Sequence, residues 1–587
     1  MAEQIISPGV FQNENVPVAL EAAAAPIGAA IIGPATKGPM EIPTTVTTYT
    51  DYVTKFGAGV VSGGIEYSYF TGISAQNYFK QGGTNLTVIR VASGSQDFTP
   101  ATSSAIISGS NGGSLTVDNV FKLQTISEGA NQNSDSVETT GNALPSGSSD
   151  NLRWEVTNVD SGSGIFTLNI RQGNDRQADK TILESWRGVS LDPKRDDYIA
   201  KVIGNQTFTI GTDGDDSYVS VTGEYPNNSK YVIVKDVLAP TPDYLDGAGN
   251  FKPQFTSSLP AAQSGSFGNG VGSLFFGGAG GTKYYKDITA TNSQGLIAKD
   301  YTASVNLLKN KDQYAFNVIS TPGLIYEFTT AVDGVSHKSV LDDIITNTTT
   351  RGDSILPIDI VAYGATTATA ITQAGLLNTN YAAAYWPWLL VKDENTSANV
   401  WCPASTVIPS VYVFNDNTSE AWFAPAGFTR GTMPNVVAPE KTLPRGLRDN
   451  LYTAKINPIA TFPGTGVVVY GQKTLQSLST ALDRVNVRRL MIALKAFIGN
   501  VSQNLVFEPN SLQTRNSFLS VVNPYLESVQ QNQGLYAFKV VMDDSNNGPD
   551  VIDRQELRGA IYLQPVKTAE FIVLDFNLLP TGAEFPA

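Results

Sequence analysis

Cysteine and histidine are almost absent from this sequence. Its 587 residues include a single cysteine, Cys402, and a single histidine, His337. One cysteine excludes an intrachain disulfide, and one histidine excludes a metal site built from several imidazoles. Cys402 stands in an apolar Trp-Cys-Pro run, so we expect a buried structural thiol and not a nucleophile. We expect His337 at the exposed start of a helix, which leaves a catalytic Ser–His pair as a weak alternative.

Charged residues are also scarce, at 16% of the chain against about 25% in an average soluble protein. Lysine and arginine total 39 and aspartate and glutamate total 53, which gives a net charge of −14. Because contacts with phosphates require dense basic residues, this balance argues against nucleic acid as a direct partner. Two explanations of the low charge stay open at this point. One is a β-rich fold with a Ser/Thr/Asn surface, and the other is a surface covered by further subunits, since interface cores are depleted in charge.

Long hydrophobic runs are missing as well. The best candidate, residues 16–36, is rich in alanine and carries one charge, but Pro17, Pro26 and Pro34 interrupt it. Proline breaks a helix in its interior, and no other stretch reaches the 18 or so apolar residues that a membrane span requires. We therefore predict no stable membrane insertion.

None of the sequence motifs that carry chemistry is complete. Residues 543–548 resemble the start of a calcium loop, but Arg554 occupies the place where an EF-hand has a bidentate glutamate. The glycine-rich run 277–283 lacks the Gly-Lys-Ser/Thr order of a phosphate-binding loop. The carboxylates show no pairing that indicates a glycosidase site. The sequence therefore predicts a chain that is not an enzyme, with no catalytic, cofactor-binding or metal-binding residue.

What the chain does contain is a succession of regions that differ in composition. Strand and helix signals alternate up to about residue 95, and short β runs separated by Ser/Gly/Asn/Asp turns follow. From about residue 310, strands and helices alternate again, which indicates an α/β layer with some parallel pairing. The predicted fold class is a multidomain α+β and α/β chain. It has an α/β inner domain with extended terminal arms, plus inserted β-rich outer domains.

The expected boundaries follow these shifts of composition. We expect an N-terminal linking arm (1–20), a discontinuous middle β-rich domain (21–95 with 186–311), a protruding β domain (96–185), an inner α/β domain (312–566) and a C-terminal strand and arm (567–587).

Near the C-terminus the pattern predicts two long helices followed by strands. The first is expected over residues 474–500, with Thr474 as N-cap. The second is expected over residues 511–531, broken or kinked at Pro524. Strands are expected over residues 535–542, 560–564 and 569–576.

The first of these helices carries basic residues on one face. Offsets of 4 and 11 residues place Arg484, Arg488 and Lys495 within about 40° of one line, at 100° per residue. In an acidic chain such a stripe indicates a binding surface for an acidic partner. An ordinary solvated face with local ion pairs is the alternative, and the sequence does not decide between them.

Several motifs, in a fixed order, resemble those of a known family, the tail sheath proteins of contractile-tailed bacteriophages. The resemblance covers roughly residues 5–95 and 312–577. Its N-terminal motifs are SPGV (7–10), GPATKGP (33–39), FG (56–57), YFKQGG (78–83) and VIRV (88–91). Its later motifs are YWPW (385–388), WFAPAG (422–427), INPI (456–459), GQKTL (471–475), VNVRRL (485–490), FEPN (507–510), Pro565 and EFI (570–572).

The resemblance implies a structural subunit of a contractile sheath. Such subunits stack as hexameric rings around a tail tube and contract to drive the tube through the host envelope, which opens the way for genome ejection. The implied partners are further copies of the chain, the tail tube protein, and baseplate and tail terminator proteins. The implied location is the virion, after assembly in the host cytoplasm. A tailocin or contractile injection system with the same mechanics is one alternative, and a glycan-processing tail enzyme is another.

Two sets of residues receive roles from this resemblance. The family links neighbouring subunits through terminal arms that add strands to a sheet of another subunit. The basic stripe Arg484, Arg488 and Lys495 is expected to face the tube. The residues expected in the linking arms are Ile5, Val10, Phe11, Val16, Phe571, Val573, Leu574 and Phe576.

Overall fold

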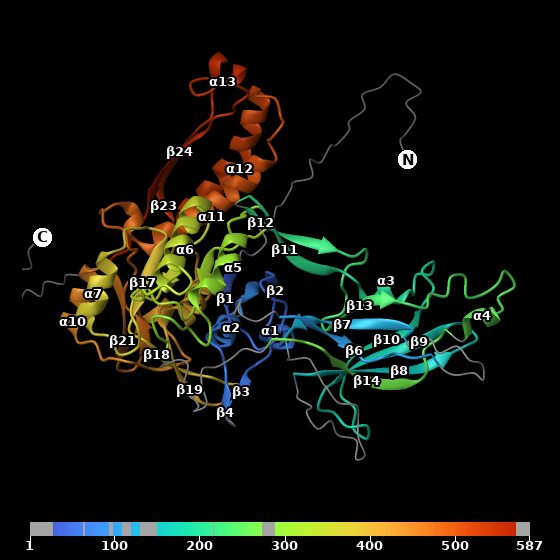
Figure 1. Ribbon diagram of the computed structural model, residues 1–587. Helices are drawn as coiled ribbons and strands as arrows, with labels where there is room; N and C mark the ends of the chain where they lie inside the picture. Colours follow the sequence, from blue (N-terminus) through green and yellow to red (C-terminus); the bar gives the residue numbers. More distant parts are fainter. Residues whose placement is uncertain are drawn as a thin grey trace, which may run out of the picture.

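The computed structural model describes residues 28–62, 65–92, 98–108, 119–129, 150–214, 216–256, 258–272 and 288–570. They form a central α/β body, a β insertion that projects to one side of it, and a C-terminal lobe that rises above it (Figure 1). Within these ranges no helix combines the length and the apolar character needed to cross a membrane.

The first sheet of the body joins segments that are far apart in the sequence. Its strand order is β15-β1-β5-β2, with β1 parallel to both β15 and β5 and with β2 antiparallel. All five residues of β1 are buried, as expected of a strand covered on both faces. The elements of this part are β1 (Ala29–Gly33), β2 (Thr44–Val46), α1 (Tyr49–Phe56), β3 (Val60–Ser62), β4 (Ile65–Tyr67), α2 (Phe70–Lys80), β5 (Leu86–Arg90) and β15 (Val318–Ser320).

A second sheet, β16-β17-β21-β22, continues the first one. β16, β17 and β21 are parallel, and β22 closes an antiparallel hairpin with β21. An isolated parallel bridge between Val318 and Ile355 connects the two sheets. The elements are η1 (Ala298–Tyr301), α5 (Thr302–Leu307), α6 (His337–Arg351), β16 (Leu356–Ile358), α7 (Thr367–Gly375), β17 (Ala382–Trp386), η2 (Ala404–Thr406), α8 (Ile408–Thr418), α9 (Gly427–Arg430), α10 (Arg445–Thr453), β21 (Ile456–Phe462) and β22 (Gly466–Val469).

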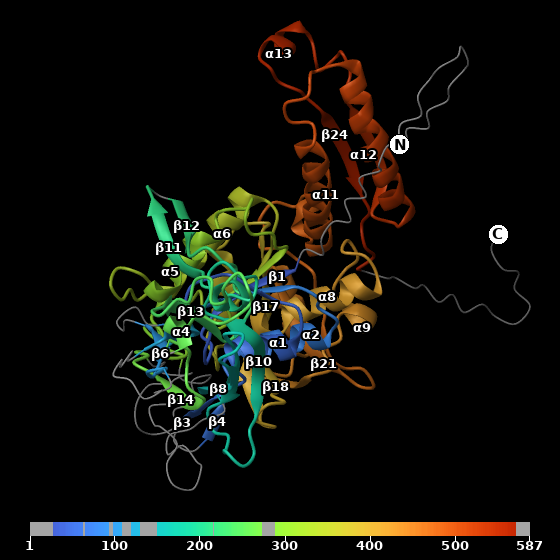
Figure 2. The same ribbon diagram turned by 90° about the vertical axis from the view of Figure 1, so that its right-hand side faces the viewer.

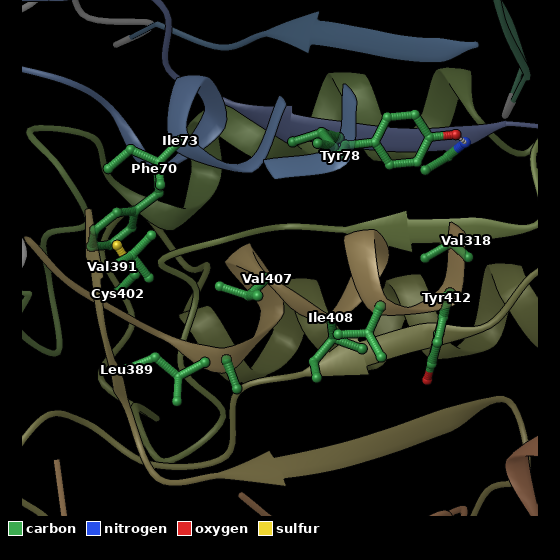
Figure 3. Close-up of a cluster of buried hydrophobic side chains, with 14 of the residues drawn as sticks. Phe70, Ile73, Tyr78, Val318, Leu389, Val391, Cys402, Val407, Ile408 and Tyr412 are labelled. Carbon is green, nitrogen blue, oxygen red and sulfur yellow. Dashed lines mark hydrogen bonds between the residues drawn. The ribbon is translucent and has the colours of Figure 1, made fainter. Parts of the chain in front are cut away.

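A small three-stranded sheet, β19-β18-β20, completes the body. It consists of β18 (Leu389–Lys392), β19 (Asn399–Cys402) and β20 (Val436–Pro439). Figure 3 shows the core that it shares with α2 and α8, with Cys402 beside Phe70 and Val391. Cys402 is fully buried, and burial raises the pKa of its thiol far above the ordinary value, so the thiol stays protonated and unreactive. The expected structural role of this cysteine is confirmed.

His337 differs from its expected setting in one respect. It is the first residue of α6, as predicted, but it is fully buried where we expected an exposed position. Its ring meets Phe328 edge to face, and its Nδ1 accepts a hydrogen bond of 3.3 Å from the Ile325 backbone N–H. Burial lowers the pKa of His337 to about 4, so the ring is neutral at pH 7. These neighbours come from the segment just before the helix, which packs back over its first residue, and local charge patterning does not reveal that packing.

The β insertion consists of a seven-stranded sheet of order β10-β9-β8-β14-β6-β7-β13 and a separate hairpin, β11-β12. Trp154, Phe121 and Phe166 are buried in its core. Its elements are β6 (Pro100–Ser103), β7 (Phe121–Glu128), β8 (Leu152–Asp160), β9 (Ile165–Gln172), β10 (Ile182–Ser190), α3 (Ile199–Ile203), β11 (Thr207–Asp213), β12 (Asp216–Thr222), β13 (Val232–Val237), α4 (Pro253–Thr256) and β14 (Gln263–Gly268).

The strand pairing corrects two of our expected boundaries. The boundary between 185 and 186 falls inside β10, so it divides a single strand of one sheet. The strands in the described part of 21–95 do not share a sheet with those of 186–311 either, because β1 and β5 pair with β15 in the body. Composition reports local strand content, whereas these boundaries depend on which distant strands pair.

A buried arginine fixes the insertion to the body. The Arg90 side chain, at the end of β5, donates hydrogen bonds to the carbonyls of Ala35 (3.1 Å), Gly38 (2.6 Å) and Glu128 (2.8 Å). The Gly38 backbone N–H also donates to the Ser127 hydroxyl at 2.7 Å. Glu128 and Ser127 end strand β7 of the insertion, so one guanidinium connects the two parts.

The C-terminal lobe is formed by two long helices and a hairpin. Figure 2 shows α11 and α12 side by side, with β24 against them. The elements are η3 (Ala481–Asp483), α11 (Val485–Gln503), α12 (Leu512–Gln531), β23 (Leu535–Val541), α13 (Pro549–Asp553) and β24 (Ala560–Pro565). Its core contains Leu490 and Leu494 of α11, Phe518, Val522, Leu526 and Val529 of α12, and Leu535 of β23.

The ends of these helices agree only in part with the sequence. α12 begins after Ser511, whose hydroxyl accepts from the Thr514 N–H, and it passes through Pro524 without a break. The first helix is shorter than predicted, because it begins at Val485. Thr474 is not its N-cap. The Thr474 hydroxyl instead donates to the Leu482 carbonyl at 3.0 Å and fixes a loop against the body.

Candidate functional site at the start of helix α11

Helix α11 begins where the C-terminal lobe meets the body. Arg484 is its N-cap residue in an extended conformation, and an isolated bridge pairs it with Lys473. The Val485 N–H donates to the Gln472 carbonyl at 2.8 Å, which ties the first turn to the body. Three arginines therefore leave this first turn at the junction of two parts of the chain: Arg484, Arg488 and Arg489.

Arg484 holds the start of the C-terminal segment, residues 567–570, against the body. We call these four residues the root. Its Nε and one terminal nitrogen donate to the two carboxylate oxygens of Glu570, at 2.6 and 3.0 Å. Gln472 donates to the same carboxylate at 3.1 Å and to the Thr568 hydroxyl at 2.5 Å. Arg484 and Gln472 together thus fix Thr568 and Glu570 to the body. We call Arg484, Gln472 and Glu570 the latch.

The charge of Glu570 is stabilised within the latch. Burial alone would raise the pKa of its carboxyl, but hydrogen bonds from Arg484 and Tyr452 outweigh burial and lower the pKa below the ordinary value. Lys473 lies nearby, with its Nζ 4.2 Å from the centre of the Tyr452 ring. Burial, and then the charge of Arg484, lower the pKa of Lys473. The latch is thus ionised at neutral pH.

Arg488 is buried between the lobe and the body. It is 3% exposed, donates to the Asn380 side-chain oxygen at 2.7 Å, and its guanidinium lies 4.1 Å from the centre of the Tyr381 ring. Burial lowers its pKa from the ordinary value. Such a cation–π contact is stronger when the charge is removed from water. Arg488 therefore stabilises the junction and does not offer its charge to an external partner.

Lys495 lies two turns further along α11 and is exposed, while the Arg484 side chain is 26% exposed. The three basic residues therefore do not form a continuous exposed stripe, and this part of our sequence prediction is wrong. Arg488 and Lys495 lie in the helix as expected, but Arg484 is its extended N-cap, and the arginine side chains pack against residues from other segments. The contact of this helix with a tube stays a prediction.

Arg489 was not singled out from the sequence. It is 4% exposed and donates to both carboxylate oxygens of Asp416, at 2.8 and 2.5 Å. Its guanidinium also lies 4.7 Å from the centre of the Tyr412 ring. An arginine pair within an otherwise apolar helix was the signal that could have indicated it. Arg488 and Arg489 together connect α11 to two separate parts of the body.

The hairpin β23-β24 presents two open edges. Each strand pairs only with the other among the described residues, so the outer edge of each strand has no neighbouring strand there. Phe538, Val540, Ile561 and Leu563 pack toward the lobe core, whereas Tyr536 and Tyr562 are each 62% exposed. The predicted linking residues of the arms all lie outside the described residues: Ile5, Val10, Phe11, Val16, Phe571, Val573, Leu574 and Phe576.

Comparison with known proteins identifies relatives of this chain. Residues 478–578 match the family described as phage tail sheath C-terminal domain. The tail sheath protein of Vibrio phage KVP40 is 39% identical over 209 residues, which cover 36% of this chain and 31% of that protein. The tail sheath protein of Enterobacteria phage T4 is 39% identical over 193 residues, which cover 33% of this chain and 29% of that protein. The matched region thus spans about a third of the length of these curated relatives.

A solved structure extends the likeness of fold to most of the chain. The crystal structure of a sheath tail protein from Listeria innocua aligns with a TM-score of 0.52, covering 93% of this chain and 96% of that one, at 10% identity. At this identity the likeness shows a shared fold alone. The family match contains Arg484 and Glu570 of the latch and both junction arginines, Arg488 and Arg489, and it confirms that this chain resembles the tail sheath proteins of contractile phages.

Proposed function

We propose that this chain is a structural subunit of a contractile phage tail sheath. Copies assemble as stacked hexameric rings around a tail tube, and the sheath contracts to drive the tube through the host envelope. The observation that carries this proposal is the 39% identity to two tail sheath proteins, together with the family match across the C-terminal lobe. The chain acts by assembly and not by catalysis.

The open edges of β23 and β24 support a route of assembly. Exposed strand edges are templates for pairing with another chain. We propose that the N-terminal arm (1–20) of one neighbour and the C-terminal segment (567–587) of another add strands here. Main-chain hydrogen bonds supply the affinity in this mode, and they depend little on side-chain detail.

The latch gives this linkage a fixed root. Thr568 and Glu570 are held to the body by Gln472 and Arg484, so the segment that follows leaves from one defined point. A sheath requires two stable packings of the same rigid subunits, one extended and one contracted. A root fixed at one point would keep neighbouring subunits linked while their packing changes.

The proposed partners follow from this role. They are further copies of the chain, the tail tube protein, and baseplate and tail terminator proteins, without direct nucleic acid contact. The proposed location is the virion tail, after assembly in the host cytoplasm. The tube-facing surface that we propose is the exposed part of α11 around Lys495, since Arg488 is occupied inside the subunit.

Electron microscopy of the purified chain tests the proposal. The full chain should form striated tubes, and a variant with Ile5, Val10, Phe11 and Val16 changed to serine should stay a folded monomer with an unchanged melting profile. A matched control changes the polar Gln12, Asn13 and Asn15 to serine and should still form tubes. Compact monomers of the full chain, under conditions that assemble tail sheaths, would refute the proposed function.

A further inference from the structure

The far tip of the C-terminal lobe exposes apolar side chains. Val506 is 60% exposed, Phe507 103% and Leu512 63%, all at the turn between α11 and α12, and Ile552 of the neighbouring α13 is 43% exposed. The backbone of Phe507 has a φ of 73°. A positive φ is uncommon and costly for a bulky residue. Since Phe507 buries nothing within the subunit, its own fold does not explain this cost.

The same tip carries negative charge around the apolar centre. Four carboxylates are exposed there: Glu508, Asp544, Asp550 and Asp553. Of these, Asp544 forms an ion pair with Arg515, while Arg554 and Arg558 both form ion pairs with Glu556. The tip therefore presents an apolar knob with an acidic rim. We call Val506, Phe507, Leu512 and Ile552 the knob.

The body presents a surface of complementary chemistry. Three aromatic rings, those of Phe428, Phe462 and Tyr470, lie 5.0 to 5.9 Å apart between centres. The guanidinium of Arg448 lies 4.9 Å from the centre of the Phe462 ring and 5.5 Å from that of Tyr470. Phe428 is 51% exposed and Tyr470 is 44% exposed. We call these four residues the aromatic face.

A second arginine stands on the same helix as Arg448. The side chain of Arg445 is 89% exposed, and its contact with Asp449 is long, at 4.0 Å. Leu447, on the same helix α10, is 37% exposed and adds apolar surface. Exposed aromatic and arginine side chains are the residue types that dominate binding at interfaces. The knob and the aromatic face are therefore complementary in both apolar character and charge.

One copy cannot bring these two surfaces together. α13 lies at the upper end of the lobe, while α10 and β21 lie low on the body, and the turned view shows the same separation of α13 from β21 (Figures 1 and 2). We propose that the knob of one copy docks on the aromatic face of a second copy. A contact between two different surfaces of identical chains is heterologous, and it generates rings or helical polymers. The contact uses side chains and no residue of the arms, so it adds to strand exchange.

Charge reversal in the full chain tests this contact. Glu508→Arg and Arg448→Glu should each raise the protein concentration needed for polymer formation by about tenfold, as measured by sedimentation. An effect of this size is in the range of a hot-spot substitution. The combined variant should recover most of that loss. Phe507→Ser should act like either single change, and Leu238→Ser, at a half-exposed apolar residue of the insertion, should have no effect. Unchanged sedimentation of Phe507→Ser, or no recovery in the combined variant, would overturn the proposal.

Disulfide trapping identifies the partner directly. Mixing Phe507→Cys with Phe428→Cys under mild oxidation should give a disulfide-linked dimer of the two variants, and the buried native Cys402 should not compete. A Phe507→Cys product linked only to itself, or to tube protein when tube is present, would overturn the contact between copies. The contact would also be overturned by a different result with Phe428→Cys alone. That result is an introduced thiol that residues 571–587 of the same chain protect from reaction, and that becomes reactive when they are deleted. In each of these cases tubes could still form through the arms, so the sheath function would stand.

Discussion

Replacing Glu570 with glutamine should release the root of the C-terminal segment while leaving the fold intact. The change keeps the shape of the side chain but removes the charge that Arg484 pairs with through two hydrogen bonds. Hydrogen bonds to charged groups contribute about 1.5–3 kcal/mol, whereas exposed ion pairs contribute about 0–1 kcal/mol. The latch is partly exposed, with side-chain exposures of 26% and 16%, so we expect a loss of about 1.5 kcal/mol, a factor of about ten in the docked population.

Limited proteolysis measures this population. Trypsin cleaves after Lys567, an exposed residue within the root, and cleavage requires the neighbouring residues to leave the body. When opening is fast relative to cleavage, the cleavage rate follows the population of the open form. The rate at Lys567 should therefore rise about tenfold in Glu570→Gln. The global melting temperature should change little, because the released segment is short.

The control is Glu556→Gln, which removes a carboxylate from an ion pair with Arg558 elsewhere in the lobe. It should leave cleavage at Lys567 unchanged. The pH dependence offers a second readout. Because the pKa of Glu570 lies below its ordinary 4.5, the latch contributes fully above pH 4.5 and is lost as the pH falls through the lowered pKa. Equal cleavage rates for wild type and Glu570→Gln at neutral pH would refute our account of the latch.

Three further predictions concern buried charges. Arg489→Ala leaves Asp416 without its ion-pair partner, and removing one partner of a buried pair is costly. The free energy of unfolding, measured by denaturant titration, should fall by about 3 kcal/mol. A loss below about 1 kcal/mol would contradict this prediction. Burial raises the pKa of Asp359 to about 7 despite hydrogen bonds from Ser405, so its contribution to stability is present below pH 3.8 and is lost as the pH rises toward 7. Asp359→Asn should remove this pH dependence from a plot of the free energy of unfolding against pH. A variant curve that runs parallel to the wild-type curve would contradict the prediction. In Arg90→Lys the side chain reaches fewer carbonyls. Amide hydrogen exchange at the end of β7 should become faster, with little change in the core of the insertion. Exchange that stays unchanged, or that becomes faster uniformly, would refute the role of Arg90 in joining the insertion to the body.

The sequence was sufficient for features encoded locally. Ser511 and the apolar period after it predicted the start of α12, and the apolar run around Cys402 predicted a buried thiol. The ordered motifs predicted the resemblance to tail sheath proteins, which the comparisons confirm.

Features that depend on distant pairing were not predicted. The boundaries failed because β1 pairs with β15, about three hundred residues away in the chain. Arg488 was placed on the correct helix face, but Tyr381 and Asn380, which bury it, come from a loop before β17. Helical period gives the direction of a side chain relative to its own helix and not what packs against it.

The carbonyl cage around Arg90 has a mechanical consequence. The insertion is joined to the body both by chain connections and by a guanidinium that contacts the two parts at once. A rotation of the body is therefore transmitted to the insertion instead of being absorbed at a loose hinge. Since displacement grows with distance from the axis, the insertion works as a lever, and a probe on its far strands would report small turns of the body as large movements.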